Sequence, residues 1–81
     1  MNDTLGWVYY KKGMPILAVQ PFRDSVERAP KNPMYQFHLG LAYVKTGDTA
    51  GARKALEAAL ALDPKFKGAE EAQKTLASLK S

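Results

Sequence analysis

Apolar residues recur three and four positions apart along most of the chain, which is the spacing of one face of an α-helix. The pattern breaks at four places, each marked by a glycine or a proline: Gly13, Pro30, Gly47 and Pro64. Glycine is common just past a helix end, and proline cannot continue a helix because it lacks the N–H donor. The pattern therefore predicts an all-α chain of five helices with no β-strand.

The first four of these helices form two similar units. The segment LGWVYYKKG at residues 5–13 returns as LGLAYVKTG at residues 39–47, displaced by 34 residues. Further identities at the same displacement are Ala18/Ala52, Pro30/Pro64 and Lys31/Lys65. A repeat of this length indicates stacked helical hairpins, because one hairpin cannot bury its own apolar face.

The repeat divides the chain into three parts. These are a first repeat at residues 1–32, a second repeat at 33–66 and a capping helix at 67–80, all within one domain at 1–81. In the last part, one apolar stripe is formed by Ala69, Ala72, Leu76 and Leu79. Such a stripe is typical of a helix that covers the preceding repeat and turns its other side to water. The N-terminal side of the first repeat has no matching cap.

Two glycines indicate how the helices of each hairpin meet. Gly6 and Gly40 fall inside helices at equivalent places, where glycine costs about 1 kcal/mol relative to alanine. A cost that recurs in both units indicates that the second helix of each hairpin approaches closely there. The side chains expected to fill around the two contacts are Leu5, Tyr9, Phe22, Val26, Leu39, Tyr43, Leu56 and Leu60.

Helix start signals agree with these boundaries. Asn32 and Asp48 are each placed to cap a helix, and Pro33 suits a first helical position. Pro21 and Gly51 fall inside helices, where each costs stability and where the sequence shows no benefit.

Composition mainly excludes classes of site. The chain of 81 residues is 46% apolar and 25% charged, and it contains no cysteine, so disulfides, thiol nucleophiles and zinc–thiolate sites are absent. The longest apolar run is interrupted by Glu57, so we expect no membrane span. The net charge of +4 comes from scattered Lys and Arg, which favours a basic surface over a specific nucleic-acid site. Weak, salt-sensitive binding to nucleic acid stays as a third alternative.

No residue pattern suggests chemistry. His38 is the single histidine and has no cysteine or carboxylate pair at a metal-ligand spacing. The chain has no glycine-rich phosphate loop, and no serine is spaced to pair with that histidine. We expect no catalytic, cofactor-binding or metal-binding residue, and hence no enzyme.

The repeated pattern resembles a known family. L-G-x-x-Y, then Ala, then an aromatic residue or Leu four positions on, then Pro, at a period of 34, is similar to the tetratricopeptide repeat. The resemblance covers about residues 1–66, although Asn2 and Gln36 stand where the family often has Trp. It implies an α-solenoid of two helix-turn-helix hairpins plus a C-terminal capping helix. It also implies a module for protein–protein interaction.

In that family, the first helix of each hairpin lines a concave groove that holds peptides. The residues of this chain at the corresponding places are Trp7, Tyr10, Lys11, Phe37, His38, Leu41, Val44 and Lys45. The hairpin cores are already supplied by other side chains, so Trp7 and Phe37 are expected on a separate, exposed face, which is typical of a binding surface. The alternative is that Trp7 and Tyr10 pack between adjacent helices.

Several uses of these surfaces stay open. Lys11 and Lys45 occupy equivalent places and would favour a partner with acidic residues, unless they are simply solvated lysines that stabilise helix ends. The first function is capture of a peptide or partner protein in an apolar-floored groove. The alternative is a structural repeat unit. Its uncapped N-terminal face would then be used either to form a homodimer or to stack in a longer array. The compartment is open between the cytoplasm and a bacterial cell envelope.

Overall fold

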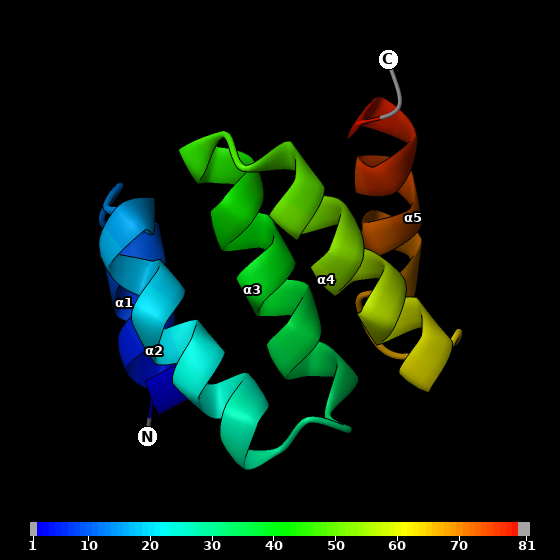
Figure 1. Cartoon of the computed structure of the whole chain (residues 1–81), viewed down its shortest axis with the longest axis horizontal. Helices are drawn as coiled ribbons and strands as arrows, with labels where there is room; N and C mark the ends of the chain where they lie inside the picture. The colour runs from blue at the N-terminus through cyan, green and yellow to red at the C-terminus, as the bar shows by residue number, and fades with distance from the viewer. Residues whose placement is uncertain (1, 80–81) are drawn as a thin grey trace.

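The computed structural model describes residues 2–79, which form five α-helices and no strand within that range (Figure 1). The helices are α1 (Asn2–Lys11), α2 (Pro15–Arg28), α3 (Pro33–Thr46), α4 (Thr49–Leu62) and α5 (Ala69–Leu79). The prediction of an all-α repeat fold with five helices is confirmed. The helices are separated near Gly13, Pro30, Gly47 and Pro64, as the sequence predicted. Met1 and Lys80, the outer ends of the first repeat and the capping helix, lie outside the described residues.

The turns have the backbone geometry that their residues favour. Gly13 and Gly47 adopt φ values of 77° and 88°, in the left-handed region that glycine enters without steric cost. The Asn32 side chain caps α3 by accepting hydrogen bonds from the backbone N–H groups of Met34 and Tyr35, at 2.9 and 3.4 Å. The two glycines therefore mark the ends of α1 and α3, and the Asn32 cap fixes the start of α3.

The start of α4 explains the unfavourable glycine at position 51. The Asp48 carboxylate caps α4 by accepting a hydrogen bond of 2.9 Å from the Gly51 N–H. A Cβ atom on Gly51 would lie only 2.7 Å from Asp48 Oδ2. Gly51 therefore leaves room for the carboxylate of its own helix cap.

Both hairpins close over a glycine, as the repeat predicted. A Cβ atom at Gly6 would lie 2.5 Å from the Phe22 ring, and one at Gly40 would lie 2.8 Å from two carbons of the Leu56 side chain. Phe22 and Leu56 are fully buried, so neither can move aside. The missing side chains at these two positions thus allow each helix pair to cross closely.

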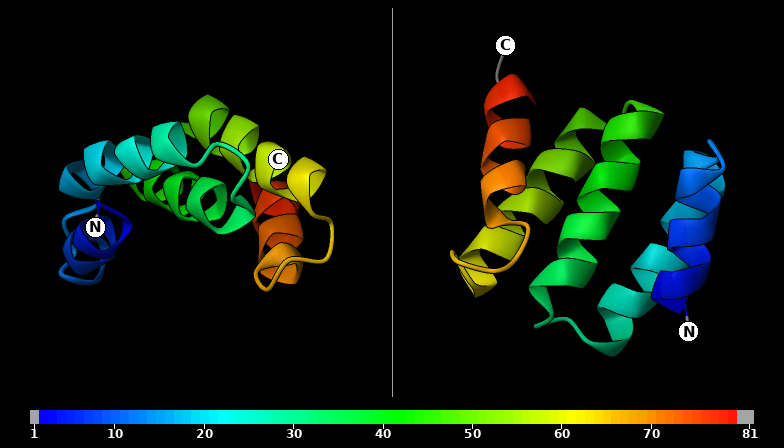
Figure 2. Two further views of the ribbon diagram at one scale, coloured as in Figure 1. Left: turned by 90° about the horizontal axis from the view of Figure 1, so that it is seen from below. Right: turned by 180° about the vertical axis from the view of Figure 1, so that it is seen from behind.

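The five helices form an arch, and Figure 2 shows α1, α3 and α5 on its inner side with α2 and α4 outside. Two apolar clusters hold it together. One joins α3, α4 and α5 and contains Phe37, Leu41, Leu56, Ala59, Phe66, Ala69 and Ala72. The other joins α2, α3 and α4 and contains Ala18, Phe22, Leu39, Ala42 and Ala55. Leu76 and Leu79 pack against the first cluster, so α5 covers the second hairpin as predicted.

Most of the predicted core positions are buried or partly buried, but Leu5 is not. Leu5 is 45% exposed, whereas Leu39, its equivalent in the second repeat, is 7% exposed. The reason is tertiary: α2 packs over Leu39, and no helix among the described residues covers the corresponding face of α1. The prediction that both repeats use this leucine as core is therefore wrong for the first.

The crossing at Gly40 can be tested by substitution. Gly40→Leu should lower the free energy of unfolding by about 1–3 kcal/mol, because the added side chain must displace buried Leu56. Ala61→Leu, at an exposed site of α4, is the matched control and should change stability little. Urea unfolding of both variants measures the difference. A Gly40→Leu variant as stable as the parent would contradict the close crossing.

Candidate binding groove

A cavity of about 450 Å³ lies on the inner side of the arch and is lined by α1, α3, α5 and the loop before α5. We call it the inner cavity, and its lining residues are Trp7, Tyr10, Met34, Phe37, His38, Leu41, Lys67, Gly68 and Glu71. Its volume falls in the range of pockets that bind small ligands or anchor side chains. Its lining combines an apolar floor with charged residues from the α5 side.

Trp7 forms one wall and also packs between helices. Its ring stacks on Tyr10 with centroids 5.1 Å apart and planes 4° from parallel. It also stacks on His38 of α3 at 4.7 Å and tilts against Phe22 of α2 at 6.2 Å. Trp7 is therefore partly buried: it packs between helices, as one of the two alternatives has it, and it also lines the inner cavity.

Phe37 and Leu41 form the floor of the inner cavity and belong to the core. Phe37 is 6% and Leu41 8% exposed, so the expectation that Phe37 stands on a separate, exposed face is wrong. Phe37 packs edge-on against Phe66 with centroids 5.5 Å apart, and a Cβ atom on Gly68 would lie 2.6 Å from its ring. The chain before α5 folds closely onto Phe37, and this contact buries the ring.

A second cavity, of about 590 Å³, adjoins the first. We call it the basic cavity, and it is lined by Tyr10, Lys11, Gly13, Pro15 and Lys45. Tyr10 lines both cavities, so the two meet at its ring. Gly13 lies in the turn between α1 and α2 and Pro15 begins α2, so the left-handed backbone of Gly13 shapes this end of the groove.

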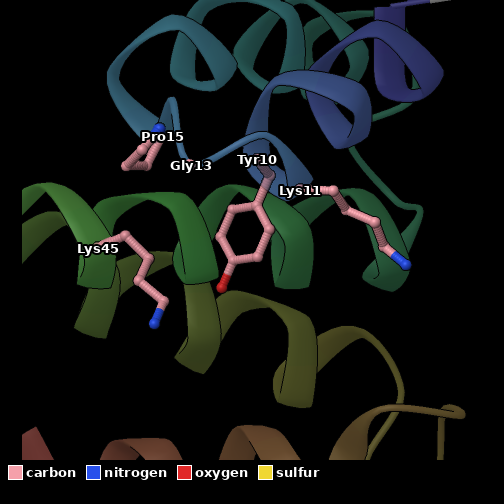
Figure 3. Close-up of a pocket in the computed structure, with 5 residues that line it drawn as sticks. All are labelled: Tyr10, Lys11, Gly13, Pro15 and Lys45. Atoms are coloured by element: carbon pink, nitrogen blue, oxygen red, sulfur yellow. The ribbon is translucent and has the colours of Figure 1, made fainter.

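The two lysines do not converge on one point. Figure 3 shows the Tyr10 hydroxyl and the Lys45 ammonium group pointing to the same side, while the Lys11 side chain extends away from Lys45. Lys11 Nζ lies 5.7 Å from the centroid of the Trp7 ring, a cation–π contact. Lys45, in the last turn of α3, is the exposed cation that stays beside Tyr10. The basic cavity thus has one ammonium group available to a ligand and one that covers Trp7.

Glu71 places a negative charge opposite α1. Burial raises the pKa of the Tyr10 phenol above its ordinary value, and the charge of Glu71 raises it further. Tyr10 therefore stays neutral and can donate a hydrogen bond throughout the physiological pH range. The interaction also means that α5 faces the groove with its charged side.

The structure brings together most residues predicted for the groove. Five of them line the inner cavity, namely Trp7, Tyr10, Phe37, His38 and Leu41, and Lys11 and Lys45 line the basic cavity with Tyr10. Val44 is partly buried and lines neither cavity.

The sequence did not predict four residues that line the inner cavity. These are Met34 in the first turn of α3, Lys67 and Gly68 in the loop before α5, and Glu71 of α5. Met34 had a usable signal, since it lies one helical turn before Phe37 on the same face. Lys67, Gly68 and Glu71 had no such signal in the sequence. The apolar stripe predicted a capping helix whose polar side faces solvent.

Among the side chains that the structure describes, no three from His, Cys, Asp or Glu are grouped so that they could hold a metal ion. In the same part of the chain, no helix is both long enough and apolar enough to cross a membrane.

Comparison with known families identifies the second repeat. Residues 33–66 match the family model described as tetratricopeptide repeat, which coincides with α3, α4 and the loop that follows them. This match confirms the resemblance read from the sequence for the second repeat. No curated protein matches the chain significantly.

The electrostatic interaction between Glu71 of α5 and Tyr10 of α1 predicts a pKa change. Glu71→Gln should lower the pKa of Tyr10, because the charge that disfavours the phenolate is removed, yet leave it above the ordinary value because burial stays. Glu70→Gln is the matched control, since Glu70 is exposed and lies 3.9 Å from Lys74 of its own helix. NMR titration of ring-labelled tyrosine, assigned with Tyr10→Phe, measures both. Equal effects of the two variants would contradict the pairing.

Proposed function

We propose that the chain captures a peptide segment or partner protein in the groove of the arch, because residues 33–66 match the tetratricopeptide repeat family, whose repeats are generally protein-interaction modules. The observation that carries the proposal is the pair of cavities that meet at Tyr10. A segment lying across α3 can place one large apolar side chain in the inner cavity and continue into the basic cavity.

The floor of the inner cavity supports an apolar anchor. Trp7, Phe37 and Leu41 are held in fixed positions by core packing, so a ligand side chain does not have to order them on binding. Preorganised apolar pockets of this kind give most of the binding energy in peptide recognition.

The basic cavity supports selection for an acidic residue in the ligand. Lys45 and the neutral Tyr10 hydroxyl point to the same side, so a carboxylate there can accept a hydrogen bond from each. Such contacts mainly set specificity and association rate. Glu71, at the other wall, disfavours an acidic group inside the inner cavity and so separates the apolar and acidic positions of the ligand.

Self-association is the second candidate use of the chain. The specific observation in its favour is the exposure of Leu5, whose equivalent Leu39 is covered by α2. This use does not compete with the groove, because Leu5 lines neither cavity.

Peptide selection tests the groove. Peptides selected from a random phage-displayed library should carry a large apolar residue and a nearby acidic one. Each should change the fluorescence of Trp7, the only tryptophan in the chain. Lys45→Glu should raise the dissociation constant of such peptides about tenfold at low salt, and less at high salt.

The matched control is Lys54→Glu, which makes the same charge change on α4, in a shallow recess lined by Leu39 and Ala55. It should leave binding nearly unchanged. Selected peptides that do not alter Trp7 fluorescence, or a loss of binding as large for Lys54→Glu as for Lys45→Glu, would contradict the proposed groove.

A further inference from the structure

The turn between α1 and α2 exposes two large apolar side chains. Met14 is 46% exposed and Ile16 is 74% exposed. Neither side chain lines the inner cavity or the basic cavity. Lys12, which precedes them in the same turn, is exposed as well. We call Lys12, Met14 and Ile16 the turn patch.

The second repeat provides an internal comparison, because the first hairpin already packs against it. The equivalents of Met14 and Ile16 there are Asp48 and Ala50, 34 residues later. Both are exposed, although the first hairpin precedes them. This turn of a hairpin therefore lies outside the contact that stacks one repeat on the next. The exposure of the turn patch is a property of the turn and does not depend on what precedes α1.

The residues of the turn patch differ from their counterparts in a consistent direction. At the three equivalent positions the second repeat has the smaller or more polar residues Thr46, Asp48 and Ala50. The sequence also contains no acidic residue between Asp3 and Asp24, a range that includes the turn and both of its flanks. The first turn is thus apolar and basic where the second is polar.

Met14 has its place in the turn at a cost to the helix that follows. It is the N-cap residue of α2 and makes no side-chain hydrogen bond to that helix. At the equivalent start of α4, the Asp48 carboxylate accepts a hydrogen bond from the Gly51 N–H. An aspartate at the N-cap stabilises a helix, and an aliphatic residue there does not. A residue that weakens a helix start while exposing an apolar side chain indicates a surface used for contact.

Further lysines lie beside the turn patch. Lys11 directly precedes it at the end of α1. Lys45 of α3 lines the basic cavity together with Gly13 and Pro15 of the same turn region (Figure 3). In the part of the chain that the structure describes, neither Lys12 nor Lys45 forms an ion pair. Three ammonium groups therefore accompany the two apolar side chains.

The neighbouring turn leaves this positive charge in place. The α1–α2 and α3–α4 turns lie at the same end of the arch (Figures 1 and 2). Asp48 of the second turn is acidic, but its carboxylate caps α4, and the positive end of the helix dipole offsets its charge. A negatively charged surface can therefore approach this end of the arch.

We propose that the turn patch attaches this end of the arch to the surface of an anionic lipid bilayer. Met14 and Ile16 enter the boundary between headgroups and acyl chains, and the lysines contact the anionic headgroups. A fluid bilayer accepts a convex turn without the shape complementarity that a protein pocket requires. Nucleic acid offers negative charge but no apolar phase for Ile16. The attachment is weak and reversible, since two side chains bury little apolar area.

Vesicle cosedimentation tests the attachment. The chain should sediment with vesicles of an equal mixture of phosphatidylcholine and phosphatidylglycerol, and much less with phosphatidylcholine alone. Ile16→Ala should lower the partition coefficient for the mixed vesicles about tenfold, because most of an exposed aliphatic side chain is removed. Lys12→Ala should lower it about fivefold, and less at high salt.

Leu62→Ala is the matched control for Ile16→Ala. Leu62 is 39% exposed in the last turn of α4, and α4 ends at the opposite end of the arch (Figure 1). This variant removes the same number of carbon atoms as Ile16→Ala and should leave partitioning unchanged.

Met14→Asp separates attachment from folding. Asp at position 14 should cap α2 as Asp48 caps α4, and so raise the melting temperature by about 4–8 °C. The same substitution should lower vesicle binding at least as much as Ile16→Ala, because it replaces an apolar side chain by a negative charge. A residue with a purely structural role would not give a more stable chain that binds vesicles less.

Several outcomes overturn the proposal. One is a chain that sediments with neither kind of vesicle, which leaves a protein partner as the use of the turn, and another is equal sedimentation with both kinds. A third is a loss for Leu62→Ala as large as for Ile16→Ala. A fourth is binding that depends on Lys12 but not on Ile16, since that is adsorption through the net charge of +4. Peptide capture is measured separately through Trp7 fluorescence, and Ile16→Ala should not change it.

Discussion

The close crossing of the two helices within each hairpin controls the rest of the structure. At Gly6 and Gly40 the backbone of the inner helix meets a fully buried side chain of the outer helix, Phe22 or Leu56. This contact sets how near the two helices of each hairpin lie. Both hairpins have this contact, and the five helices form an arch with α1, α3 and α5 on the inside (Figure 2).

The curvature of the arch gives several inner side chains two roles. Trp7 packs against Phe22 and His38, and so helps to join the repeats, while the same ring forms a wall of the inner cavity. Phe37 is a core residue and also the cavity floor. A binding surface made of core residues is rigid, which lowers the entropic cost of binding a ligand. It also couples the shape of the groove to the stability of the fold.

The capping helix α5 likewise acts on both of its sides. Its alanine and leucine stripe completes the core of the second hairpin, and Glu71 on another side lines the cavity and raises the pKa of Tyr10.

The sequence by itself determined the helices, their caps and the two close crossings, because these depend on contacts within one hairpin or one helix turn. Short-range geometry, which any chain with these residues would share, determines the roles of Asn32, Asp48, Gly40 and Gly47. Only the tertiary structure decided which equivalent residues are covered. Leu5 and Leu39 have the same place in the repeat, yet one is exposed and the other buried, because burial depends on the neighbouring element. For the same reason, no local signal in the sequence predicted that Glu71 lines the groove or that Phe37 is buried in the core.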